Sequence, residues 1–294
     1  MCLDRPAAKA GRFFSNYKMN PTFSIGILTC DRPEFFDHCI NSIRFVHASH
    51  LIIVNSGTHD TYFSPEFAVK SKILESKNDQ KTPASIASGK NHIVQVFLES
   101  TQDDFLYIIE DDVRVVNPRI FYDYIELSLE SGLQHLIWGG GGPNNRRPNK
   151  DPIAIHQIEY TNGQVAVFYK HCVGMFNLYS RKLLEKIGGF DEKFVNSMEH
   201  VDHSYRAVKE GFLPAYGVWP DLQDSNECLF DQDPDFEKST MKEKSRVNVN
   251  VADAVKYFTE KHGFSPYNFP TIEQTDLALR LSKIQKIFTA QAPG

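Results

Sequence analysis

The sequence predicts an α/β fold built around a mostly parallel sheet, and two observations support this prediction. Residues 105–109 (FLYII) form a short apolar run that is typical of a strand buried on both faces, and similar runs occur at 23–29 and 50–54. Segments in which apolar residues recur at helical spacing separate these runs. Strands that alternate with helices favour a parallel sheet with helices on both faces.

Further elements follow from the same patterns. Pro33 favours the first turn of a helix after the first strand. Residues 153–170 alternate like antiparallel strands around an Asn162-Gly163 turn. Residues 1–20 resemble a tail, and residues 139–148 form a glycine-rich loop that we expect to be flexible. The other predicted elements are helices at 65–77, 83–100, 119–130, 181–187, 202–210, 252–262 and 271–288, and strands at 136–138 and 173–179.

Composition narrows the class of protein. The chain has 294 residues, of which 41% are hydrophobic and 23% charged, as in ordinary globular enzymes. The net charge of −5 supplies no general basic field, so we expect no nucleic-acid partner. Five cysteines without a CxxC pair argue against a disulfide framework and for a reducing compartment. The sequence contains no apolar run of the roughly 20 residues that a spanning helix needs. We therefore predict a cytoplasmic protein without a transmembrane segment, and peripheral membrane contact stays open.

Three consecutive carboxylates, Glu110, Asp111 and Asp112, follow the strand at 105–109 directly. Open α/β sheets place ligands at the carboxyl ends of their strands. Because neighbouring carboxylates repel one another, we expect a cation to share them. The leading candidate is a divalent ion that holds a diphosphate, and Mn²⁺ and Mg²⁺ both prefer oxygen ligands. The alternative is a solvated turn that binds nothing.

Five segments in the same order resemble those of nucleotide-sugar glycosyltransferases with the GT-A fold, closest to glycosyltransferase family 2. The segments, which cover roughly residues 22–220, are 24–33 (SIGILTCDRP), 53–58 (IVNSGT), 87–91 (ASGKN), 110–112 (EDD) and 188–202 (GGFDE, then EHVD). The resemblance implies one GT-A domain at 21–234, with a small antiparallel sheet beside the central one. It leaves residues 235–294 as a helical C-terminal extension.

The resemblance also implies where the donor and the metal bind. Asp112 would be the direct metal ligand, and Glu110 would contact the ribose or a metal-bound water. Lys90 stands in place of an arginine of the family and would pair with the diphosphate as a point charge. Asn55 replaces the acid that usually reads the base, and an amide can also read uracil. The donor site implied in this way comprises Thr29, Asp31, Arg32, Asn55, Lys90, Asn91, Glu110, Asp111 and Gly174.

The segment 198–203 is the implied acceptor side. Inverting relatives carry Glu-Asp here, and the Asp takes the proton from the acceptor hydroxyl. In this chain His200 occupies the Asp position. Three interpretations stay open: Glu199 or Asp202 is the base, His200 is the base because imidazoles titrate near neutral pH, or the enzyme has no base and retains configuration. Asp202 also suits the cap of the following helix.

Relatives often carry a late histidine that completes the metal site. The only histidine beyond His203 is His262, which we expect on the surface of a C-terminal helix. Asp221 and Asp224 occupy the usual region but are of a different residue type. The predicted metal shell is therefore incomplete on this side.

The implied activity is transfer of a sugar from a nucleoside diphosphate donor to a hydroxyl of a glycan or glycolipid acceptor. A UDP-sugar is the default donor, inversion the default outcome, and Mn²⁺ or Mg²⁺ the Lewis acid. The enzyme would be a hexosyl- or N-acetylhexosaminyltransferase of polysaccharide biosynthesis. A nucleotidyltransferase with a strand-end metal site is one alternative. A non-catalytic sugar-binding descendant of the fold is the other, because His200 replaces the expected Asp.

Overall fold

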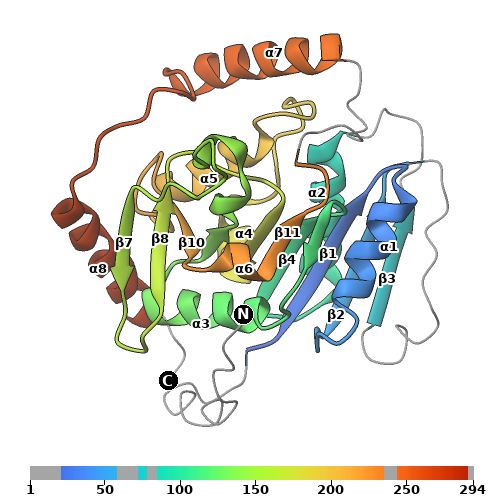
Figure 1. The fold of residues 1–294 in the computed structure, drawn as a ribbon, viewed down its shortest axis with the longest axis horizontal. Helices are drawn as coiled ribbons and strands as arrows, with labels where there is room; N and C mark the ends of the chain where they lie inside the picture. Colours follow the sequence, from blue (N-terminus) through green and yellow to red (C-terminus); the bar gives the residue numbers. More distant parts are fainter. Residues whose placement is uncertain (1–20, 58–71, 78–84, 235–243, 291–294) are drawn as a thin grey trace.

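The computed structural model describes residues 21–57, 72–77, 85–234 and 244–290 (Figure 1). A six-stranded sheet in the order β3-β2-β1-β4-β9-β6 lies at its centre. The strands are β1 (Phe23–Thr29), β2 (His50–Asn55), β3 (Lys72–Lys77), β4 (Phe105–Glu110), β6 (His135–Ile137) and β9 (Phe176–Ser180). The first four in this order run parallel, whereas β9 is antiparallel to both of its neighbours. The predicted mostly parallel sheet is confirmed.

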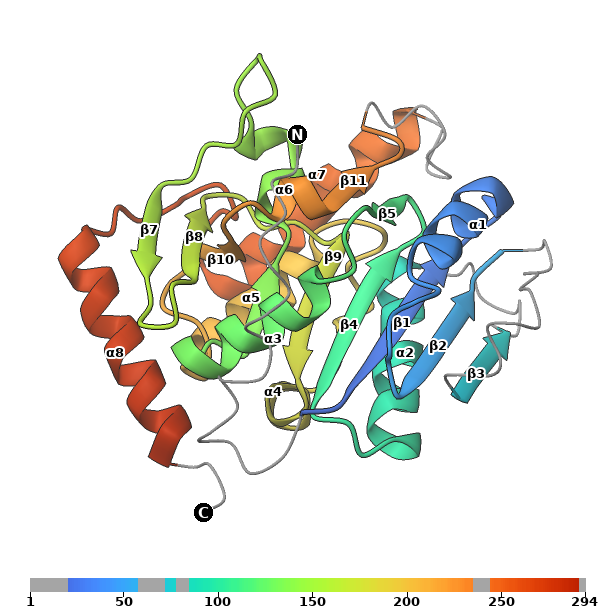
Figure 2. The same ribbon diagram turned by 60° about the horizontal axis from the view of Figure 1, so that its bottom comes forward.

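Helices cover both faces of this sheet. They are α1 (Pro33–Ser42), α2 (Ile86–Ser100), α3 (Ile120–Ser131), α4 (Arg181–Ile187) and α5 (Glu199–Lys209). Figure 2 shows α1 and α2 on opposite faces of the parallel strands. Gly26 of β1 permits the close approach of α2, because a Cβ there would lie 2.2 Å from Cγ2 of Ile93. Strands covered in this way must be apolar on both sides, which is why β1 and β2 read as continuous apolar runs.

Two smaller sheets complete the α/β body. β7 (His156–Glu159), β8 (Val165–Tyr169) and β10 (Trp219–Leu222) form an antiparallel sheet, and β5 (Val113–Val115) pairs with β11 (Leu229–Asp231). The predicted antiparallel pair around Asn162-Gly163 is confirmed by the pairing of β7 with β8. The sequence reasoning missed β10 and β11, which lie in a polar stretch that shows no strand alternation.

Two predictions about local structure are wrong. Residues 72–77, predicted to end a helix, form β3, which pairs with β2 from His50 opposite Lys72. The rest of that predicted helix, 65–71, lies outside the described residues. The glycine-rich segment is not a loose loop: it forms 3₁₀ turns at Gly139–Gly141 and Pro143–Asn145, and residues 139–142 and Asn145 are buried.

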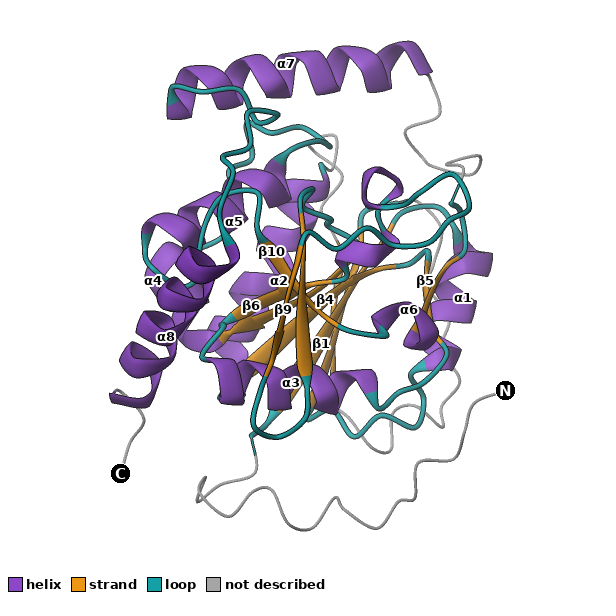
Figure 3. Ribbon diagram, turned by 60° about the vertical axis from the view of Figure 1, so that its left-hand side comes forward, coloured by secondary structure: helices purple, strands orange, loops and turns teal. Residues whose placement is uncertain are grey.

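Two helices, α7 (Lys244–His262) and α8 (Gln274–Ala290), follow the α/β body. Figures 1 and 3 show α7 crossing one end of the molecule, and Figure 1 shows α8 beside β7. Phe258 of α7 and Leu277 of α8 are fully buried, so both helices pack on the rest of the protein. None of the helices in the described residues is long and apolar enough to cross a membrane.

Candidate active site

The strand-end cluster consists of Glu110, Asp111, Asp112 and Asp231, where β4 leaves the sheet. Its backbone is fixed on both sides, because the Glu110 N–H donates to the Met175 carbonyl at 2.9 Å and the Asp111 N–H to the Leu28 carbonyl at 3.1 Å. The parallel order β2-β1-β4 brings the end of β4 beside the turns that follow β1 and β2. The predicted carboxylates therefore lie at the sheet edge where α/β proteins bind ligands.

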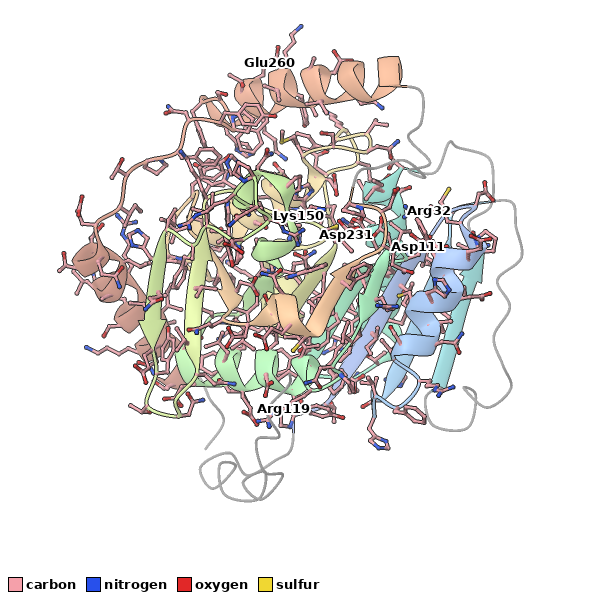
Figure 4. All side chains as sticks on the ribbon, in the orientation of Figure 1. Arg32, Asp111, Arg119, Lys150, Asp231 and Glu260 are labelled. Atoms are coloured by element: carbon pink, nitrogen blue, oxygen red, sulfur yellow. The ribbon has the colours of Figure 1, made fainter. Side chains whose placement is uncertain are left out.

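Asp111 is already neutralised within the protein. Its buried carboxylate accepts a hydrogen bond from Thr29 Oγ1 at 2.7 Å and forms an ion pair with Arg32. Figure 4 shows Arg32 reaching toward Asp111 from the turn after β1. Thr29, Arg32 and Asp111 thus come together, and they join two strand ends through charge and hydrogen bonding.

Asp112 is the carboxylate whose charge is least balanced. One oxygen, Oδ2, lies 3.0 Å from an Arg32 nitrogen, whereas Oδ1 is buried and has no hydrogen-bond partner among the described residues. Burial, Glu110, Asp111 and Asp231 all raise the pKa of Asp112, Arg32 lowers it, and the result is about 7. Such a group gains stability from any further cation that reaches its free oxygen.

Asp231 is the member of the cluster that sequence reasoning missed. Pairing of β11 with β5 places Asp231 opposite Val113, and the Gln232 N–H donates to the Asp112 carbonyl at 2.8 Å. Asp231 is near enough to Asp112 to raise the pKa of that carboxyl. Burial raises the pKa of Asp231, Arg146 lowers it, and Glu110 raises it. Asp231 therefore adds a fourth carboxylate to the cluster from a segment far along the chain.

These residues suit a hard divalent cation in part. All of their donors are carboxylate oxygens, the type that Mn²⁺ and Mg²⁺ prefer, and the free Oδ1 of Asp112 is the open position. Among the described residues, no three His, Cys, Asp or Glu side chains are grouped closely enough to hold a metal by themselves. A cation at Asp112 would therefore take its other ligands from a bound molecule or from water.

Lys90 ties the strand-end cluster to α5. Its ammonium lies 2.8 Å from Glu110, 3.1 Å from Glu199 and 3.2 Å from the Gly174 carbonyl. An ammonium has three N–H donors, so these three contacts use all of them. Burial lowers the pKa of Lys90, but Glu110 and Glu199 raise it further, and it stays charged. In this arrangement Lys90 has no donor left for a diphosphate.

Glu199 and His200 lie on the other side of Lys90. Glu199 is 2% exposed, and its pKa is lowered because Lys90 and His200 outweigh the effect of burial. Nδ1 of His200 lies 3.2 Å from the same Glu199 oxygen that Lys90 contacts. A Cβ on Gly174 would come within 3.1 Å of both His200 and Lys90, so only glycine fits between them without displacing one.

Asp202 is engaged elsewhere. It is fully buried, and it lies 3.1 Å from Arg206, 2.7 Å from Lys261 and 2.8 Å from His262. The expectation that His262 is a surface residue is therefore wrong, since only 3% of its side chain is exposed. A buried carboxylate needs partners, and α7 supplies the Lys261 ammonium and the His262 ring, whose pKa is lowered by burial.

The remaining predicted donor residues serve local structure. Asn91 donates to the Phe190 carbonyl at 2.9 Å and to Glu192 at 2.7 Å, which holds the turn after α4. Asn55 accepts from the Gly57 N–H at 2.9 Å. Asp31 has a left-handed φ of 51°, and it fills the space that a Cβ on Gly57 would need. The turns after β1 and β2 are thus in contact.

The glycine-rich segment borders the strand-end cluster, and hydrogen bonds to buried side chains hold it in place. Asp221 accepts from the Gly140 N–H at 3.2 Å and from Ser225 Oγ at 2.9 Å, and burial raises its pKa to about 7. Nε1 of Trp138 donates to Asn226 at 2.8 Å. Asp221 therefore shapes this loop from within the protein instead of facing a metal.

Comparison with known proteins shows which fold carries this site. No family model and no curated protein sequence matches the chain. A crystal structure of S. aureus TarS 1-349 superposes with a TM-score of 0.52 and 11% identity, over 92% of this chain and 72% of that one. The mannosyltransferase PcManGT from Pyrobaculum calidifontis, in complex with GDP-Man and Mn²⁺, superposes with a TM-score of 0.53 and 10% identity. The match covers 94% of this chain and 77% of that one. This chain spans 32% of a longer TarS chain, at a TM-score of 0.47.

The protein therefore has the GT-A fold of nucleotide-sugar glycosyltransferases, as the sequence predicted. At these identities the similarity establishes the fold, and the chemistry has to be argued from the residues of this chain.

Proposed function

We propose that the protein is a glycosyltransferase that moves a sugar from a nucleoside diphosphate donor to a hydroxyl of a glycan or related acceptor. One observation carries the proposal: a buried carboxylate oxygen of Asp112 has no partner in the described part of the chain, within a cluster that carries surplus negative charge at the end of the sheet where α/β proteins bind ligands. The fold supports the proposal, because the mannosyltransferase that shares it was crystallised with GDP-Man and Mn²⁺.

The roles of the residues follow from their charges. Asp112 would hold a divalent cation, with Glu110 and Asp231 adding negative charge around it. When bound, the cation neutralises charge on the departing diphosphate. Thr29 and Arg32 fix Asp111 and thereby orient the strand end. Asn55, Asp31 and Asn91 would shape the nucleotide side through backbone position, and Gly174 lets Lys90 and His200 pack closely.

Donor hydrolysis distinguishes this function from its alternatives. The protein would be incubated with UDP-glucose, UDP-N-acetylglucosamine or GDP-mannose, with Mn²⁺ or with chelator, and the products identified. Release of nucleoside diphosphate only with metal is the expected result. Pyrophosphate release from a nucleoside triphosphate and a sugar phosphate would instead identify a nucleotidyltransferase. Binding of nucleotide sugars without any turnover would identify a sugar-binding descendant of the fold.

A further inference from the structure

The proposed function needs a group that removes a proton from the attacking hydroxyl. The segment 199–202 offers Glu199, His200 and Asp202. Asp202 is fully buried and is contacted by Arg206, Lys261 and His262, and Glu199 is 2% exposed with Lys90 against it. Only His200, whose side chain is 23% exposed, can be reached by a substrate.

We infer that Nε2 of His200 is the catalytic base, and that Glu199 and Lys90 are the residues that position it. This inference rests on the proposed function and names the proton acceptor at the same site.

The hydrogen bond to Glu199 determines which nitrogen of the His200 ring can act. An ionised carboxylate only accepts hydrogen bonds, so Nδ1, 3.2 Å from Glu199, carries the hydrogen in the neutral ring. The lone pair is therefore on Nε2, which has no hydrogen bond to any described residue. A carboxylate behind an imidazole also stabilises the imidazolium that forms when the proton arrives.

Lys90 keeps this pair in place from the donor side. Its ammonium contacts both Glu110 and the Glu199 oxygen that faces His200. Two other titratable groups lie near His200: Cys172, whose Sγ lies 3.9 Å from the His200 backbone carbonyl, and His135 of β6. Burial raises the pKa of Cys172 to about 12 and lowers that of His135 to about 4, so both are neutral at pH 7.

The step balances without any further reactant. The acceptor O–H gives its proton to Nε2 while the oxygen forms a bond to the anomeric carbon. The bond from that carbon to the diphosphate oxygen breaks, and its electron pair leaves with the diphosphate. The imidazolium then returns its proton to solvent. Attack from the side opposite the leaving group inverts the configuration.

The test uses hydrolysis of whichever nucleotide sugar the intact protein cleaves, with water as the acceptor. His200→Ala should lower kcat by about 10²–10⁴-fold, the usual contribution of a general base, with the donor KM nearly unchanged. Added imidazole should restore part of the rate, because the ring is partly exposed. The acidic limb of the wild-type pH–rate profile should be absent from His200→Asn. Glu199→Gln should lower kcat less than His200→Ala does, and it should shift the acidic limb of the profile to a different pH.

The outcomes separate the two proposals. Wild-type cleavage combined with full turnover and an unchanged acidic limb in His200→Asn would overturn the assignment of the base and leave the transferase function standing. If His200→Ala loses rate, added imidazole does not restore it and the donor KM rises, then His200 has a structural role. That result would also overturn the assignment of the base. If the wild type cleaves no nucleotide sugar, the proposed function fails and the inference fails with it.

Discussion

The strand-end cluster and the start of α5 contain the same type of side chain in opposite electrostatic situations. At the strand end, burial and the neighbouring carboxylates raise the pKa of Asp112 to about 7. At the helix start, Lys90 and His200 outweigh burial and lower the pKa of Glu199, and Asp202 is paired with Arg206 and Lys261. The first region contains a carboxylate oxygen with no partner among the described residues, whereas the carboxylates of the second have basic partners within the protein. The first region is therefore the one that a bound cation would stabilise.

The largest expected effect removes the residue that joins the two regions. Lys90→Met leaves Glu110 and Glu199 without their shared cation, and loss of one partner of a buried ion pair costs about 3–5 kcal/mol. Urea unfolding would measure the change. The control is Lys186→Met, whose exposed pair with Glu210 should be worth less than about 1 kcal/mol. Similar losses in the two variants would contradict a special role for Lys90.

The pH dependence of stability should distinguish the two regions. The folded-state pKa of Asp112 is raised to about 7 from 3.8, so the folded protein holds an extra proton between these values and its stability falls as pH rises through them. Asp112→Asn removes this term. In the presence of chelator, the free energy of unfolding of Asp112→Asn relative to wild type should therefore increase from pH 4 to pH 7.5, by on the order of 3 kcal/mol.

Glu199 should show the opposite sign in the same unfolding measurement. Its folded-state pKa is lowered, so its contribution is present at neutral pH and is lost as pH falls below 4.5. If the difference in unfolding free energy between wild type and Glu199→Gln became larger at acidic pH, that result would contradict the charge balance described for the helix start.

A smaller effect concerns ligand affinity at the strand end. We expect Asp112→Asn to weaken Mn²⁺-dependent binding of UDP or GDP about 100-fold, or about 2.7 kcal/mol, because it removes the free anionic oxygen. Calorimetry with and without Mn²⁺ would measure this loss. Asp276→Asn, on the outer side of α8, is the matched control and should bind like wild type.

The smallest effect distinguishes Asp231 from the direct ligand. Asp231→Asn removes one of the negative charges that surround Asp112 but leaves the free oxygen in place. Mn²⁺-dependent nucleotide affinity should fall about 10-fold, or about 1.4 kcal/mol. A loss as large as that of Asp112→Asn would mean that Asp231 contacts the cation directly.

Local signals predicted the core of the fold well. The buried strands β1, β2 and β4 follow from apolar runs, and the helix at 181–187 was predicted to the residue. β3 was predicted as a helix because its pairing with β2, not its own sequence, determines its conformation. β10 and β11 are too short to show an alternation of their own, and their pairing with β8 and β5 makes them strands.

Prediction of the site was limited for the same reason, because some of its contacts depend on pairing between segments that are distant in the sequence. The three acids after β4 are adjacent in sequence, so their mutual repulsion could be recognised from the sequence alone. Asp231 becomes their neighbour only through the pairing of β11 with β5. The contacts that use all three donors of Lys90, and the burial of His262 against Asp202, depend on how α5 and α7 meet, which periodicity does not encode.

The attachment of α7 to Asp202 has a practical consequence for shortened versions of this protein. A chain that stopped at residue 234 would retain all the strands of the described sheets, yet Asp202 would lose Lys261 and His262 and keep Arg206 alone. The damage would begin two residues from His200, in the first turn of the same helix. A trimmed enzyme that still folds is therefore expected to hold its donor normally and to deprotonate its acceptor poorly.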